Sequence, residues 1–160
     1  MKGGFQLAHL EPSGHIDDRA LVPLYEVDVS GGSGLLAVSE CVEDRIGFSR
    51  AWLTRHQINA ASAGLVRVKG DSMAPTVPDG ALVLIDTSQA RLEREGIYVF
   101  SRDGEAFVKR LVPVAPGPGG VPTSVVIISD GGTFPPEFVT GPPLNDIRVT
   151  GRVRCIIATL

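Results

Sequence analysis

Short apolar runs, separated by glycine and proline, dominate the hydrophobic pattern of this chain. Residues 21–29 (LVPLYEVDV) alternate between apolar and polar positions after Pro23, which predicts a half-buried strand. Other apolar runs of similar length predict further strands: residues 35–38, 64–69, 81–86 and 124–129, and one or two strands in residues 147–160, bent at Gly151. The pattern is typical of a mainly β protein.

Two local signals add a helix and a hairpin. Ser49 is a good N-cap for a short helix that ends near Arg55. Asp103-Gly104 lies between the alternating runs 97–101 and 106–112, which predicts a β-hairpin. Residues 113–122 predict a Pro/Gly loop and residues 130–143 an irregular segment. We therefore expect one mainly β domain over residues 21–160, with several short antiparallel strands and one short helix, and an N-terminal arm or linker over residues 1–20.

Composition narrows the class of protein. Of the 160 residues, 43% are hydrophobic and 21% are charged, which suits a packed core. The net charge is −3, so the chain has no excess of positive charge of the kind that is usual in proteins that bind nucleic acids. No run approaches the roughly 18 apolar residues that a membrane span needs. Cys41 and Cys155 are too few for a disulfide framework or a zinc cluster. We expect a cytoplasmic protein with no metal and no cofactor.

The most informative segment is residues 66–80 (VRVKGDSMAPTVPDG). A predicted strand ends at Lys69, Gly70 permits a tight turn, and Ser72 follows on that turn. On such a turn, we expect backbone N–H groups around Ser72 and Met73 to be able to point at a developing oxyanion. A serine in a Gly-Asp-Ser turn is ordinarily only a turn residue, so a nucleophilic role requires a base.

Lys109 is the candidate base. His9, His15 and His56 lie in no triad-like context, and the arginines cannot lose a proton in a protein. Lys109 shares a strand face with Phe107 and Leu111, so it points to the core if they do. Burial lowers the pKa of a lysine, and a neutral amine beside a serine can accept its proton. A strand lysine is nevertheless usually solvated.

The residues around these two side chains resemble a known family. GDSMAPTVPDGALVLID (residues 70–86) and GEAFVKRL (residues 104–111) are similar to the C-terminal domains of LexA and phage CI-type repressors, which are Ser–Lys self-cleaving peptidases. The separation of 37 residues between Ser72 and Lys109 matches the family spacing. FSRAWL (residues 48–53) and the predicted hairpin look most like the phage C2-type repressors. The resemblance implies a LexA-like fold of short, twisted antiparallel strands.

The resemblance also implies roles for individual residues. Ser72 matches the nucleophile, Lys109 the general base, and Met73 a residue lining the cleft. Family members cut their own chain in an upstream loop, commonly between alanine and glycine. The best match here is the Gly31–Gly32 bond. A glycine before the bond fits a small pocket but adds chain freedom that must be frozen, so self-cleavage is expected to be slow or lost.

The implied function is that of a regulatory domain of a phage-type or SOS-type transcriptional repressor, which forms homodimers and cleaves itself. The family relationship adds the RecA–DNA filament as a co-protease. DNA binding is expected only through a helix-turn-helix domain that residues 1–20 are too short to form, or the chain is a stand-alone relative similar to UmuD. Type I signal peptidases share related motifs but carry a membrane anchor. Two alternatives stay open: a dimerisation module with an unused dyad, and a protease that acts on other chains.

Overall fold

The computed structural model describes residues 18–25, 42–132 and 134–159. Most of the predicted N-terminal arm, the apolar run 35–38 and the predicted Gly31–Gly32 cleavage site lie outside the described residues. So does the end of the first predicted strand, which the structure follows as far as Tyr25.

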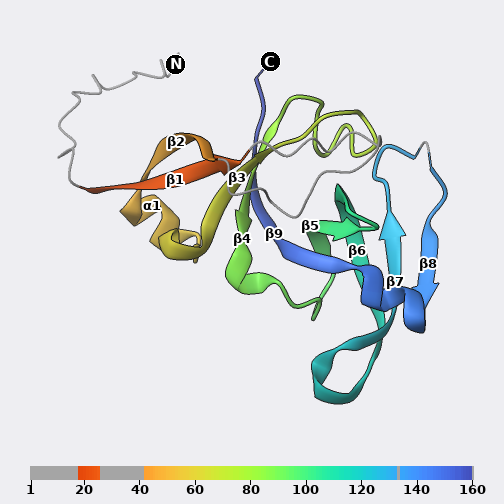
Figure 1. Cartoon of the computed structure of the whole chain (residues 1–160). Coiled ribbons are helices and arrows are strands. Elements are labelled where there is room, and N and C mark those ends of the chain that lie inside the picture. The colour runs from red at the N-terminus through yellow and green to blue at the C-terminus, as the bar shows by residue number, and fades with distance from the viewer. Residues whose placement is uncertain (1–17, 26–41, 133, 160) are drawn as a thin grey trace, which may run out of the picture.

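The described chain forms one nine-stranded sheet, with the strand order β2-β1-β3-β4-β9-β5-β6-β7-β8 (Figure 1). The strands are β1 (Arg19–Tyr25), β2 (Val42–Ser49), β3 (Ala63–Arg67), β4 (Leu82–Asp86), β5 (Gly96–Arg102), β6 (Glu105–Pro116), β7 (Pro122–Ile128), β8 (Glu137–Thr140) and β9 (Arg148–Ile157). Only β1 and β3 pair in parallel, and the other neighbours are antiparallel. The mainly β prediction is confirmed.

The predicted helix and hairpin both form. Helix α1 (Arg50–Arg55) begins after Ser49, whose hydroxyl oxygen accepts a hydrogen bond from the Trp52 backbone N–H at 3.3 Å. Strands β5 and β6 are joined at Asp103 and Gly104, which have φ values of 53° and 82°. Positive φ at both central residues is the geometry that matches the twist of a hairpin, and Asp-Gly supplies it at low cost. Among the described residues, no helix is long and apolar enough to cross a membrane.

Three strands differ from the prediction. β2 was not predicted, because it forms an edge of the sheet and its residues are mostly exposed, so no alternation marks it. β8 lies at the other edge, within the segment 130–143 that was predicted to be irregular. β6 runs to Pro116, four residues into the predicted Pro/Gly loop. The C-terminal segment forms a single strand, β9, whose pairing with β5 is irregular next to Gly151.

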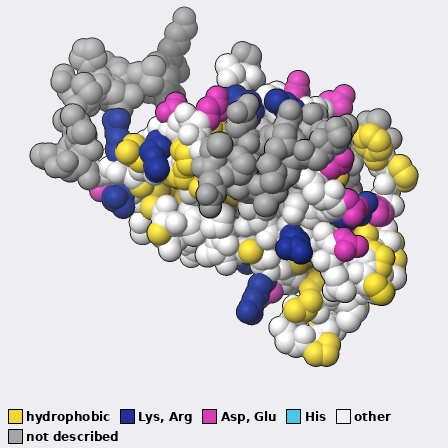
Figure 2. Space-filling model, in the orientation of Figure 1, with side chains coloured by type: hydrophobic (Ala, Val, Ile, Leu, Met, Phe, Trp, Pro, Cys, Tyr) yellow, Lys and Arg dark blue, Asp and Glu magenta, His cyan; other side chains and the backbone are white. Residues whose placement is uncertain are grey.

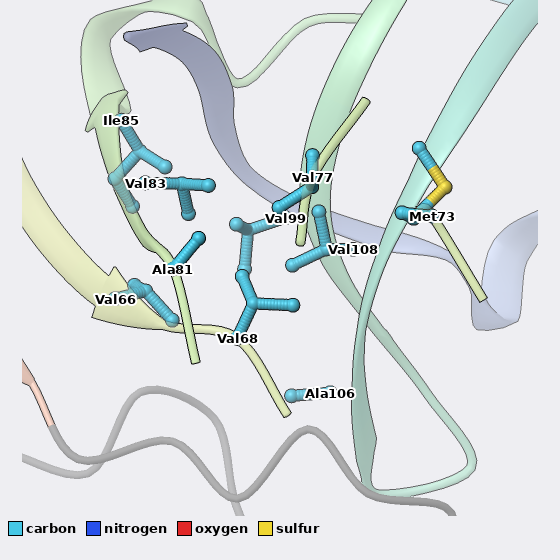
Figure 3. Packing of buried hydrophobic residues seen from close by; sticks show 10 residues of the cluster. All are labelled: Val66, Val68, Met73, Val77, Ala81, Val83, Ile85, Val99, Ala106 and Val108. Atoms are coloured by element: carbon cyan, nitrogen blue, oxygen red, sulfur yellow. The ribbon is translucent and has the colours of Figure 1, made fainter. Parts of the chain in front are cut away.

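Strand β6 is covered by core packing on both of its faces. One face carries Val108 into a central cluster that also contains Val99 on β5 and Val83 on β4 (Figure 3). The opposite face carries Leu111 into a second cluster with Tyr98 and residues of β7. A third cluster lies between α1 and strands β1, β3 and β4. Core residues therefore occupy both faces of β6.

Exposed apolar side chains gather over β7, β8 and the connection between β6 and β7, at the right of Figure 2. The large ones in this region are Val114, Val121, Phe134 and Phe138.

Candidate functional site

The predicted nucleophile lies on the turn that connects β3 to β4. The chain bends at Gly70, whose φ of 90° is disfavoured for residues with a side chain. The Gly70 N–H donates to the Asp79 carboxylate at 2.7 Å, and the Gly80 N–H donates to the Val68 carbonyl at 2.9 Å. These two hydrogen bonds close the base of the turn and hold Ser72 at its far end. The backbone N–H groups of Ser72 and Met73 donate no hydrogen bond within the described part of the chain.

The resemblance matched Met73 to a residue lining the cleft, and in the structure its side chain is buried. Its side chain is 1% exposed and belongs to the central cluster, which also contains Val77 and Val108 (Figure 3). It is absent from the residues that line the cleft described below. The thioether therefore anchors the turn to the core, and only the backbone of Met73 remains available to reacting groups.

The fold brings Ser72 and Lys109 together. Lys109 Nζ lies 2.7 Å from Ser72 Oγ, within the range of a hydrogen bond. Lys109 shares its strand face with Phe107 and Leu111, as the alternation predicted; Leu111 is fully buried, and Phe107 stacks on Phe100. The lysine is thus directed inward by its strand position and meets the turn there.

Ser129 is a third member of the site that the sequence did not indicate. Lys109 Nζ lies 2.8 Å from Ser129 Oγ, and Ser129 is buried. Continuing the β6–β7 register by one residue from the pair Arg110↔Ile128 places Ser129 opposite Lys109. Only the pairing of β6 with β7, which no local pattern reveals, joins these residues.

Burial sets the protonation behaviour of the lysine. It lowers the pKa of Lys109, because desolvation penalises the ammonium form more than the neutral amine. The ring centroid of Phe134 lies 5.6 Å from Nζ, on the open side of the site. A half-buried amine with a lowered pKa is easier to deprotonate than an exposed lysine, which is what a general base requires.

The site opens into a cleft of about 690 Å³. Its walls are mainly apolar and come from the turn, from β5 to β7, and from the segment before β8; they include Val68, Phe100, Phe107, Ile127, Phe134, Pro135 and Pro136. The charged side chains on its lining are Lys69, Asp71, Arg102, Lys109 and Glu137, and Arg102 pairs with Glu137 at 2.8 Å. Such a cleft suits a peptide segment with small or apolar side chains. No cluster of three or more potential metal ligands occurs among the described residues.

A mainly β domain in which a serine on a strand-to-strand turn meets a lysine on a hairpin has the arrangement of groups that Ser–Lys nucleophilic sites use. Residues 23–154 match the family model described as Peptidase S24-like, so the chain belongs to that family. The resemblance to the C-terminal domains of LexA and CI-type repressors is thereby confirmed.

Curated proteins that are similar to this chain include two regulators of transcription. The HTH-type transcriptional regulator PrtR of Pseudomonas aeruginosa is 34% identical over 94 residues, which cover 58% of this chain and 37% of PrtR. The repressor protein CI of Enterobacteria phage phi80 is 31% identical over 107 residues, which cover 65% of this chain and 44% of the repressor. The chain therefore spans about two fifths of the length of these relatives.

Proposed function

We propose that this chain is the regulatory domain of a transcriptional repressor and that Ser72 and Lys109 cut the chain itself at Gly31–Gly32. One observation carries the proposal: a half-buried lysine amine lies 2.7 Å from the hydroxyl of a serine held on a closed turn. The printed names of the two relatives, a transcriptional regulator and a repressor, support the regulatory role. The apolar walls of the cleft support a peptide as the group that it binds.

The reaction follows from the chemistry of the pair. Neutral Lys109 accepts the Ser72 hydroxyl proton through the Nζ lone pair, while the oxygen attacks the carbonyl carbon of Gly31. The backbone N–H groups of Ser72 and Met73 stabilise the resulting oxyanion. The protonated lysine returns its proton to the Gly32 nitrogen as the peptide bond breaks and an ester forms on Ser72. Water, deprotonated by Lys109, then hydrolyses the ester and frees the carboxylate of Gly31.

The last described residue before the proposed scissile bond lies on a strand next to β3. Tyr25 ends β1, pairs with Val66 on β3 and packs against the cluster that contains Met73. Gly31 follows Tyr25 by six residues, a length that reaches at most about 20 Å when extended. Val66 belongs to β3, the strand that leads into the turn carrying Ser72, so the chain to Gly31 starts one strand pairing away from that turn, which supports cleavage within one molecule.

We also propose that the domain dimerises along β9. Strand β9 pairs with β5 only as far as Arg152, and residues 153–157 pair with β4 alone. On the open side of this stretch lies a groove of about 520 Å³, and Ile157 is 40% exposed. A strand edge of this kind can add an antiparallel strand, and a second copy supplies the same strand by two-fold symmetry. Ile157→Lys should then weaken a dimer measured by sedimentation equilibrium.

By its family relationship, the stimulus for cleavage is proposed to be a RecA–DNA filament, and DNA is contacted by a separate helix-turn-helix domain. The Gly31–Gly32 bond favours one alternative, a dimerisation module whose Ser–Lys pair is not used, because two glycines raise the entropy cost of attack.

Incubation of the purified chain at about pH 10, near the ordinary pKa of lysine, tests the peptidase function. We expect two fragments whose masses place the cut at Gly31–Gly32. Ser72→Ala, Lys109→Ala and Lys109→Arg should each abolish the fragments, because arginine keeps the charge but cannot act as a base. Ser101→Ala, a serine outside the cleft lining, is the matched control and should cleave normally. If the wild type stays as intact as Ser72→Ala, the module without cleavage is the correct function.

A further inference from the structure

Three consecutive residues after β7 contact both halves of the candidate site. Ser129 Oγ lies 2.8 Å from Lys109 Nζ. The Gly131 N–H donates to the Ser72 carbonyl at 2.9 Å. Between them, the Asp130 N–H donates to the Met73 sulfur at 3.4 Å. We refer to residues 129–131 as the clamp.

The Asp130 carboxylate ties the clamp to the strand that carries the lysine. Arg110, which follows Lys109 on β6, donates from Nε to Asp130 Oδ1 at 2.9 Å and from Nη2 to Oδ2 at 2.7 Å. This two-point geometry fixes the orientation of both groups as well as their distance. The same carboxylate accepts a hydrogen bond from Thr76 on the turn. The hydrogen bond from Arg110 is the main reason that the pKa of Asp130 is lowered, so the carboxylate is charged at neutral pH.

The ion pair is shielded more than a surface pair. The Asp130 side chain is 11% exposed and the Arg110 side chain 29%. The other carboxylate near Arg110, that of Glu95, lies farther away at 3.4 Å and is 59% exposed. Removal of Asp130 would leave a partly buried guanidinium with only this distant partner. A buried two-point pair contributes far more than an exposed one when one partner is deleted.

We propose that Asp130 is a positioning residue of the self-cleavage reaction, which holds the turn of Ser72 and the strand of Lys109 at reacting distance through the clamp. This inference rests on the proposed function. The hydroxyl of Ser129 accepts one N–H of the neutral amine, which directs the Nζ lone pair to Ser72 Oγ. The Gly131 N–H fixes the carbonyl of Ser72 and so the direction of the nucleophile. Asp130 touches no reacting atom and acts through these two neighbours.

The cleavage rate of Asp130→Ala tests the role. We expect a loss of about 100-fold in the first-order rate constant at the pH plateau, the cost of misplacing reacting groups by about 1 Å. Asp130→Asn keeps the shape of the side chain and should lose less, so a folded variant is available even if Asp130→Ala is unstable. Glu95→Gln removes the other carboxylate near Arg110 and is the matched control, which should cleave at the wild-type rate.

The titration of Lys109 gives a readout that does not need cleavage. The chain has three lysines, Lys2, Lys69 and Lys109, so its lysine Cε signals can be assigned by NMR with few variants. The spectra are recorded in a Ser72→Ala background, which keeps the Ser72 backbone and blocks self-cleavage. Other charged groups that line the cleft with Lys109 are Lys69, Asp71, Arg102 and Glu137. Tyr98 pairs with Lys109 across the hairpin, and the Arg110–Asp130 ion pair adjoins Lys109 and Ser129 along the chain.

The direction of the titration shift separates positioning from simple electrostatics. The double variant Arg110→Ala/Asp130→Ala leaves the net charge of the protein unchanged. If the clamp opens in this variant, water should reach the amine and raise the pKa of Lys109 towards its ordinary value of about 10.4. In Asp130→Ala, the loss of a nearby negative charge would by electrostatics alone lower the pKa of Lys109. The double variant should also cleave no more slowly than the slower single variant, because both side chains serve one function.

The outcomes distinguish the two proposals. If the wild type does not cleave but the double variant raises the pKa of Lys109, the clamp is real and the peptidase function is wrong. If the wild type cleaves, while Asp130→Ala cleaves within three-fold of it and the Lys109 titration does not move in either variant, the positioning role is wrong and the peptidase function stands.

Discussion

Substitution of Gly131 by alanine tests how closely the clamp approaches the turn that carries Ser72. A Cβ at this position would lie 2.9 Å from the backbone oxygens of Asp71 and Ser72 and 3.2 Å from that of Ala74. Heavy atoms in van der Waals contact prefer a separation of about 3.5 Å or more, so the turn and the clamp must move apart by about 0.5 Å. None of these three atoms belongs to a side chain that can rotate away.

The displacement predicts two measurable losses. Overpacking of this kind lowers the free energy of unfolding by about 1–3 kcal/mol. Since a misplacement of about 1 Å costs roughly 100-fold in rate, half of that distance predicts a loss of roughly 10-fold in self-cleavage. Urea unfolding, followed by circular dichroism, measures the first quantity, and the yield of fragments with time at alkaline pH measures the second.

Gly47→Ala is the matched control. A Cβ at Gly47 meets its nearest neighbour, a side-chain carbon of Arg19, at 3.5 Å, an ordinary contact, and Gly47 lies on the exposed edge strand β2. Its free energy of unfolding should stay within about 0.5 kcal/mol of the wild type. If Gly131→Ala unfolds at the same urea concentration as Gly47→Ala and cleaves at the wild-type rate, the clamp does not approach the turn as described, and the reasoning fails.

Three further predictions concern other parts of the fold. Asp86→Asn should lower the free energy of unfolding by about 2–3 kcal/mol in urea, because the buried carboxylate accepts hydrogen bonds from three side chains. Burial raises the pKa of Asp86, but these hydrogen bonds lower it more, so the folded-state pKa lies below the unfolded-state value of about 3.9. The stability that the carboxylate contributes is therefore complete above about pH 3.9 and is lost as the pH falls through the folded-state pKa. Asp86→Asn should lack this pH dependence. Lys109→Met should abolish cleavage. In a Ser72→Ala background, which blocks self-cleavage, it should leave the free energy of unfolding equal or higher by about 1 kcal/mol, because burial of the amine is costly. The protein with Lys109 in that background should gain stability as the pH rises from the lowered folded-state pKa of Lys109 to about 10.4, and a Lys109→Met variant with the same pH dependence would contradict this. Gly104→Ala should lower the free energy of unfolding by about 1 kcal/mol relative to Gly47→Ala, because its φ of 82° strains a residue with a side chain; equal urea midpoints would show that the turn is not left-handed.

Elements that depend on neighbours along the chain follow from local signals. The Asp-Gly pair determined the hairpin, because few residues accept positive φ, and Ser49 determined the start of the helix, because its hydroxyl satisfies a free N–H. Alternation along residues 107–111 determined that Lys109 points the same way as Leu111. The motif around Ser72 and the spacing to Lys109 determined the family.

The tertiary structure decided what depends on residues far apart in the chain. The edge strands β2 and β8 have little buried surface, so their hydrophobic pattern is weak and only pairing with a neighbour defines them. Met73 is buried because the turn folds back onto β6, a contact that no periodicity encodes. The sequence on its own thus specified which two side chains to pair. The register of β6 on β7 brings Ser129, Asp130 and Gly131 to these two side chains. A register depends on how two strands pair, so the sequence of either strand by itself does not determine it.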